Sequence, residues 1–235
     1  MGKRPGGELA TRPLHFIWIA DCSGSMQADG KIQTLNEAVR EAIPHMRKAA
    51  DENPNARVLV RAVAFSDEVG WPISDPTPVE NFSWVDLQAK GISSMGKAFE
   101  SISLRLKSPP MDQRALPPVL VLISDGYPTD DFDEGLRLLL SEPWGKKSIR
   151  MAIAIGEDAD QEVLEKFIDN PQIKPLHANN PESLVKYIKW ASTSVLKAVS
   201  APMTPSSEKT SESFNILIPV PPDVEPNNSN HPDVW

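Results

Sequence analysis

The chain has 235 residues, of which 40% are hydrophobic and 24% are charged. This is enough material for one sizeable α/β core with an extension. The net charge of −8 argues against a nucleic-acid or anionic-membrane partner, because such partners are bound chiefly through Lys and Arg. Cys22 is the single cysteine, so an internal disulfide is excluded, and we expect a soluble protein in the reducing cytoplasm.

The first expected element is a strand over residues 14–20, a short apolar run typical of a strand buried on both faces. We expect residues 1–11 before it to be flexible, and the apolar run is too short for a signal sequence or a membrane span. From residue 31 apolar residues recur with helical spacing, which predicts an amphipathic helix ending before residue 53. Residues 57–65 predict a second strand, and this strand–helix–strand order indicates a parallel sheet.

Helices and strands continue to alternate along the rest of this domain. We expect helices over 94–106, 131–140, 160–168 and 182–199, and strands over 118–124, 148–156 and 173–177. Residues 70–90 are the least regular part, with a short edge strand over 69–72. Together these elements predict an α/β fold, a doubly wound, mostly parallel sheet of about six strands with helices on both faces.

The composition changes after residue 200. Residues 203–213 contain six Ser or Thr and one Pro, which is typical of a linker. Residues 214–222 are apolar and β-prone, and we interpret them as a possible docking segment. We therefore divide the chain into a flexible N-terminus at 1–11, a domain at 12–200 and a disordered, acidic, Ser/Thr- and Pro-rich tail at 201–235.

Polar residues gather where the strands are predicted to end. They are Asp21, Ser23 and Ser25 after the first strand, Ser93 and Ser94 at the start of the helix over 94–106, and Asp125 after the strand over 118–124. In an open parallel sheet, ligands bind beyond the carboxyl ends of the strands. All these donors are oxygens and two are carboxylates, which favours a hard divalent cation such as Mg²⁺ or Mn²⁺.

Three motifs carry a resemblance to a known family. The string DCSGSM at 21–26 resembles the Asp-x-Ser-x-Ser motif of von Willebrand factor A domains, which builds their metal-ion-dependent adhesion site. GISSMGKAF at 91–99 and SDGYPTDD at 124–131 are similar to two further segments of that family, in the same order. The resemblance covers residues 12–200 and is greatest to bacterial TerY-like proteins, which are associated with tellurite-resistance and stress operons.

The resemblance implies a ligand set for the cation. Ser23 and Ser25 would bind the metal directly, Asp21 and Asp125 mainly through bound waters, and Ser93 stands where the family usually has Thr, with Ser94 as a substitute. It implies a non-enzymatic module without catalytic residues that binds a carboxylate of a partner protein through Mg²⁺ or Mn²⁺. A Ser/Thr kinase-like protein and a metal-dependent protein phosphatase are the partners that the TerY-like branch suggests.

Two other functions remain open at this point. A Mg²⁺-dependent phosphoryl-transfer enzyme could use Asp21 as its nucleophile, although the second acid that such enzymes need two residues later is here Ser23. A scaffold with a degenerate metal site is the other, because Ile92 stands where the family commonly has Gly. We interpret Asp130 and Asp131 more simply as helix N-caps.

Overall fold

The computed structural model describes residues 11–53, 55–156, 159–200, 219 and 221. Within these residues six strands form one sheet in the order β3-β2-β1-β4-β5-β6. The strands are β1 (Arg12–Asp21), β2 (Ala56–Phe65), β3 (Val69–Pro78), β4 (Val119–Ser124), β5 (Ile149–Ile155) and β6 (Leu176–Ala178). Neighbouring strands pair in parallel except β2 and β3, which are antiparallel. The predicted α/β fold with a mostly parallel, doubly wound sheet is therefore confirmed.

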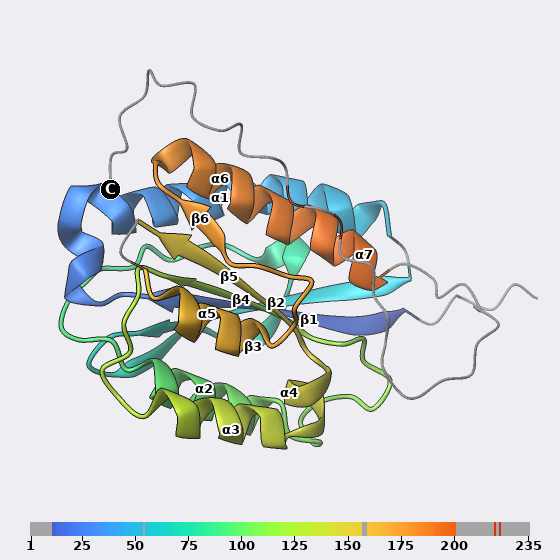
Figure 1. Ribbon diagram of the computed structural model, residues 1–235. Coiled ribbons are helices and arrows are strands. Elements are labelled where there is room, and N and C mark those ends of the chain that lie inside the picture. The colour runs from blue at the N-terminus through green and yellow to red at the C-terminus, as the bar shows by residue number, and fades with distance from the viewer. Residues whose placement is uncertain (1–10, 54, 157–158, 201–218, 220, 222–235) are drawn as a thin grey trace, which may run out of the picture.

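Helices cover both faces of the sheet (Figure 1). One face carries α1 (Lys31–Asp51), α6 (Pro181–Trp190) and α7 (Leu196–Ser200), and the other carries α2 (Met95–Arg105), α3 (Phe132–Ser141), α4 (Pro143–Lys147) and α5 (Gln161–Ile168). Shorter turns of helix are η1 (Gly24–Gly30), η2 (Val79–Asn81) and the π-helical η3 (Ala191–Val195). This arrangement leaves the ends of the strands, rather than their faces, open for a site.

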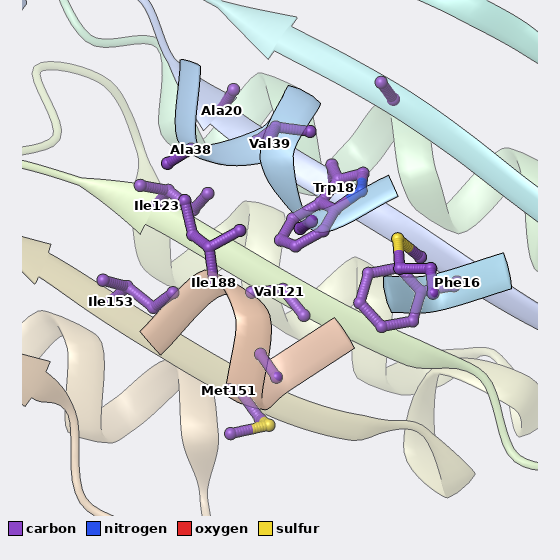
Figure 2. Packing of buried hydrophobic residues seen from close by; sticks show 14 of the residues in the cluster. Phe16, Trp18, Ala20, Ala38, Val39, Val121, Ile123, Met151, Ile153 and Ile188 are labelled. Atoms are coloured by element: carbon purple, nitrogen blue, oxygen red, sulfur yellow. The ribbon is translucent and has the colours of Figure 1, made fainter. Parts of the chain in front are cut away.

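The central strand β1 is buried from residue 14 to its end, because β2 and β4 flank it and helices cover both of its faces. Phe16 and Trp18 meet edge to face, with ring centroids 4.9 Å apart, and pack under α1 and α6 (Figure 2). Ile17 and Ile19 alternate with them and pack on the opposite face, with α2 and α5. Each such burial stabilises the fold by about 1.5–3 kcal/mol. The strand is therefore held firmly, and so is Asp21 at its carboxyl end.

The edge strand β3 is longer than predicted, since it extends to Pro78 rather than ending at residue 72. Its sequence, VGWPISDPTP, contains three prolines, which would exclude a central strand. An edge strand has one side without ladder bonds and tolerates proline, and the pairing with β2 also contains two register shifts. Residues 82–94 follow without regular secondary structure, as the irregular sequence of this region indicated.

Two boundaries near the end of the domain were predicted wrongly. The strand placed at 173–177 is β6 at Leu176–Ala178, because Ile173 still belongs to the turn after α5, where its N–H donates to Asn170 O at 3.0 Å. The helix predicted over 182–199 is interrupted by η3, where Ser192 and Thr193 donate their hydroxyls to carbonyls one turn back, each at 2.7 Å. The short elements η1 and α4 were not predicted, because neither shows a clear helical pattern in the sequence.

The predicted linker at 203–213 lies outside the described residues, as do the N-terminal residues before residue 11 and most of the possible docking segment at 214–222. Among the helices of the described chain, none is both long and apolar enough to cross a membrane.

Candidate metal centre

The predicted site residues meet at the carboxyl ends of β1 and β4, which are neighbours in the sheet. Three segments that are far apart in the sequence converge there: the turn after β1, residues 90–94 before α2, and the loop after β4. The five residues that they contribute are linked by hydrogen bonds, and they are Asp21, Ser23, Ser25, Ser93 and Asp125.

Asp21 forms the buried base of this cluster, with no exposed surface. One carboxylate oxygen, Oδ1, accepts the N–H of Ser23 at 2.8 Å. The other, Oδ2, accepts the hydroxyls of Ser124 at 2.6 Å and Ser93 at 3.3 Å. Burial raises the pKa of Asp21, and the hydrogen bonds from Ser124 and Ser23 oppose that rise. The carboxylate is thus fixed in orientation by groups from three segments.

A chain of polar contacts leads from this base towards solvent. The hydroxyl oxygens of Ser23 and Ser25 are 3.0 Å apart, and Ser25 donates to Asp125 Oδ1 at 2.9 Å. Asp125 Oδ2 lies 3.4 Å from the Nζ of Lys31, the first residue of α1. These contacts join the turn after β1 to the loop after β4.

The third segment reaches the site through close contact between two backbones. Gly24 N donates to Gly91 O at 2.9 Å, and a Cβ on Gly24 would lie only 3.1 Å from that oxygen. Gly91 itself has a φ of 68°, which few other residues adopt readily. On the far side, the N–H and hydroxyl of Thr129 both donate to Ser93 O, at 2.8 and 2.9 Å. Ser93 is therefore clamped between the two other segments.

The structure separates the two adjacent serines. Ser93 contacts Asp21, whereas the hydroxyl of Ser94 donates to Asp67 O at 3.3 Å. Of the pair, Ser93 is thus the one that faces the cluster. Ile92 is 53% exposed and lines the same cavity as Ser93.

The predicted capping roles of the two aspartates after β4 are confirmed. Asp131 accepts the N–H of Glu134 at 3.0 Å and caps α3. Asp130 caps a helix distant in sequence, since its carboxylate accepts the N–H groups of Gly96 and Lys97 at 2.9 and 2.8 Å, in the first turn of α2. The loop after β4 is thereby attached to the helix that follows Ser93.

The cluster opens into a cavity of about 360 Å³. The residues that line it are Ser23, Gly24, Ser25, Lys31, Gly91, Ile92, Ser93, Asp125, Tyr127 and Thr129. Ile92 and Tyr127 are among the most exposed large hydrophobic residues of the described chain, at 53% and 63%. The cavity above the buried Asp21 is therefore lined by hydroxyls and a carboxylate, and its rim is apolar.

The donor set fits a hard divalent cation, because serine hydroxyls and carboxylates are all oxygen ligands. Within the described residues, no three His, Cys, Asp or Glu side chains are grouped so that they could hold a metal ion. A cation here would therefore depend on the hydroxyls as well as on the carboxylates. The ammonium of Lys31 already stands beside Asp125, which shows that this corner of the cavity accommodates positive charge.

Three residues of the site were missed by sequence reasoning. Ser124 ends β4 and bonds Asp21, and the only signal was a hydroxyl at the end of a buried apolar strand. Asn36 of α1 anchors residues 84–87, which lie upstream of Ser93, and its helical position gave no hint of this. In the sequence Lys31 is only the first residue of a predicted helix, and a cation is unfavourable at that end of a helix.

Cys22 lies next to the cluster but offers it no thiolate. Its side chain is buried, and burial, with a smaller effect of Asp21, raises the pKa of the thiol to about 12. Cys22 is therefore a small buried residue of the turn after β1 and not a candidate ligand.

The sequence matches no protein-family model and no curated protein. Its fold, however, matches solved structures of von Willebrand factor A proteins. The ArnB paralog VWA2 from Sulfolobus acidocaldarius aligns with a TM-score of 0.57 and 19% identity, over 76% of this chain and 45% of that one. A von Willebrand factor type A protein from Catenulispora acidiphila aligns with a TM-score of 0.58 and 17% identity, over 80% of this chain and 43% of that one.

A third structure is proximal thread matrix protein 1 from the mussel byssus, solved with a zinc-occupied MIDAS motif. It aligns with a TM-score of 0.60 and 17% identity, over 83% of this chain and 49% of that one. This chain thus spans less than half the length of each of the three structures. At these identities the comparison establishes a von Willebrand factor A fold.

Proposed function

We propose that this chain is a metal-dependent protein-interaction module that holds an Asp or Glu carboxylate of a partner protein. The observation that carries the proposal is the convergence of three hydroxyls and two carboxylates, from three segments, at one open cavity. A bound Mg²⁺ or Mn²⁺ would supply a positive centre that accepts one further anionic oxygen. The zinc-occupied motif of the mussel protein supports a divalent cation in this fold.

Each residue of the cluster has a proposed role that follows from its place. Ser23 and Ser25 would offer neutral hydroxyls as direct ligands, with Ser93 completing that set. Asp21 and Asp125 would act mainly through bound waters, with Asp21 orienting the hydroxyls from its buried position. Because the direct ligands are neutral, much of the cation's charge stays available for the partner's carboxylate.

The rim of the cavity indicates the surroundings of that carboxylate. Ile92 and Tyr127 expose large apolar surfaces beside the oxygen donors. Exposed aromatic and aliphatic side chains around a polar centre are typical of protein interfaces. We therefore propose a partner segment in which an acidic residue is flanked by apolar side chains.

The geometry disfavours the phosphoryl-transfer alternative. A nucleophilic carboxylate must reach the phosphorus of its substrate, but Asp21 has no exposed surface and both of its oxygens accept hydrogen bonds. We therefore propose a binding role without catalysis. Turnover of a generic phosphomonoester with Mg²⁺, lost in Asp21→Asn, would contradict this.

The motif resemblance supports a narrower proposal for the biological setting. We propose a TerY-like protein of a bacterial stress or tellurite-resistance system that acts in the cytoplasm. Its partners would be a Ser/Thr kinase-like protein and a metal-dependent protein phosphatase. The sequences of the neighbouring genes would test this setting directly.

Calorimetric titration with Mg²⁺ and Mn²⁺ tests the metal centre. The variants are Ser25→Ala and Asp125→Asn, and the matched control is Ser83→Ala, since Ser25 and Ser83 are both exposed. We expect saturable binding by the wild type and the control, and a loss of at least about ten-fold in affinity in the two site variants. Absence of binding by the wild type would favour a scaffold with a degenerate site.

Partner capture tests the second half of the proposal. Proteins retained by the immobilised chain in Mg²⁺ and released by chelation can be identified by mass spectrometry. We expect Ser25→Ala and Ile92→Ser to retain less than the wild type, whereas Ser83→Ala retains as much. Equal retention with and without chelator in all variants would exclude metal-mediated binding.

A further inference from the structure

Lys31 occupies an unusual place in the wall of the cavity. Its Nζ lies 3.4 Å from Asp125 Oδ2, and the side chains are only 14% and 5% exposed. Of the residues that line the cavity, Lys31 alone carries a positive charge. Its ammonium therefore stands at a carboxylate that the proposed function assigns to the cation.

Helix preference does not explain a lysine at this position. Lys31 is the first residue of α1, and the N-terminus of a helix carries partial positive charge that disfavours a cation. The first turn of α1 contains no acidic residue that would offset this. The ion pair with Asp125, which comes from the loop after β4, is the contact that compensates the position.

We propose that Lys31 is a built-in competitor of the divalent cation, a residue that lowers and sets the affinity of the metal centre. In the absence of a divalent cation its ammonium balances the charge of Asp125. Full coordination requires Lys31 to give up that contact or to remain as a second positive charge nearby, and either costs binding free energy. The inference rests on the proposed function, since it concerns the same cavity.

Removing the charge while keeping the length of the side chain isolates this effect. Lys31→Met takes away the competitor, and Lys31→Arg retains it. Lys90→Met is the matched control, because Lys90 is exposed, precedes Gly91 and does not line the cavity. It changes the net charge of the protein by the same amount, so any general effect of charge appears in both variants.

The experiment is calorimetric titration of the full chain with Mn²⁺ alone, at constant ionic strength. We expect Lys31→Met to bind Mn²⁺ about ten-fold more tightly than the wild type, Lys31→Arg to bind within about two-fold of it, and Lys90→Met likewise. Thermal unfolding in chelator gives a second readout. There we expect Lys31→Met to unfold about 2–4 °C lower than the wild type, because Asp125 loses its partner.

The outcomes separate the two proposals. A wild type that binds Mn²⁺ while Lys31→Met binds no more tightly would overturn the competitor role and leave the proposed function in place. If Lys31→Met gains affinity no more than Lys90→Met does, the effect is one of net charge and the inference is equally wrong. If neither the wild type nor Lys31→Met takes up Mn²⁺, both this inference and the proposed function are overturned.

Discussion

The hydroxyl of Ser124 donates a hydrogen bond of 2.6 Å to Asp21 Oδ2 across the neighbouring strands β4 and β1. The same hydroxyl oxygen accepts the N–H of Gly126 at 3.0 Å, in the loop that carries Asp125. Ser124 therefore connects the buried base of the metal centre with the loop that forms one of its sides. Both strand ends are fully buried, so this contact is shielded from water.

Ser124→Ala should weaken the metal centre and the fold together. The variant removes a donor from a buried carboxylate, which costs about 1–3 kcal/mol of unfolding free energy. Urea unfolding and Mn²⁺ titration measure the two effects. Ser192→Ala is a matched control, because Ser192 is also fully buried but donates to backbone carbonyls near η3. Unchanged metal affinity in Ser124→Ala would contradict the role of Ser124 in orienting Asp21.

Gly91→Ala should displace Ser93 without unfolding the domain. The backbone of Gly91 has a φ of 68°, and an added Cβ would collide with the carboxylate of Asp67. We expect a loss of about 1–2 kcal/mol in stability and a fall of at least about ten-fold in Mn²⁺ affinity. Gly70→Ala on β3 is the control, since a Cβ there would meet nothing within 4 Å. Equal Mn²⁺ affinities in the two variants would argue that the position of Ser93 does not matter.

The parts of the fold that sequence predicted well are those with local signals. The apolar run of β1 and the spacing of apolar residues in α1 follow from burial alone, and the motif after β1 marks the strand's end. That Asp21, Ser23, Ser25 and Asp125 come together then follows from parallel strands ending at one edge.

The parts that sequence did not predict depend on contacts between distant residues. β3 is a strand despite its prolines because β2 pairs with it on one side. Residues 82–87 have no periodicity because side-chain bonds from α1, rather than backbone ladders, hold them. The separation of Ser93 from Ser94 depends on Asp67 and Thr129, and nothing near either serine in the sequence indicates it.

A substitution of Asn36 tests whether these contacts between distant residues hold the segment before Ser93. Its amide donates to Leu87 O and accepts the N–H of Leu87 and the indole N–H of Trp84, each at 2.9 Å. Asn36→Leu leaves these backbone and indole groups without a partner in a buried place, so we expect a loss of about 2–4 kcal/mol. Hydrogen exchange should show faster exchange at residues 84–94 than in the wild type. Protection equal to that of the wild type would mean that the segment is held by other contacts.

His15 gives the fold a defined response to acid. The imidazole is 5% exposed on β1, and burial, together with the nearby charge of Arg61, lowers its pKa from 6.5 to about 4. The unfolded chain then binds a proton at a higher pH than the folded protein does. His15 therefore costs no stability above pH 6.5, and stability is lost as the pH falls from 6.5 towards 4, by up to about 3 kcal/mol.

Urea unfolding between about pH 7.5 and about pH 4.5 measures this loss in the wild type and in His15→Leu. We expect the free energy of unfolding to fall less steeply with acid in His15→Leu, because its unfolded state no longer takes up that proton. The carboxylates, including Asp21, are common to both proteins, so their titration cancels in the difference between the two curves. His177→Gln is the control for replacing a histidine as such, since His177 is exposed on β6. Parallel curves for His15→Leu and the wild type would show that the buried imidazole does not govern the acid response.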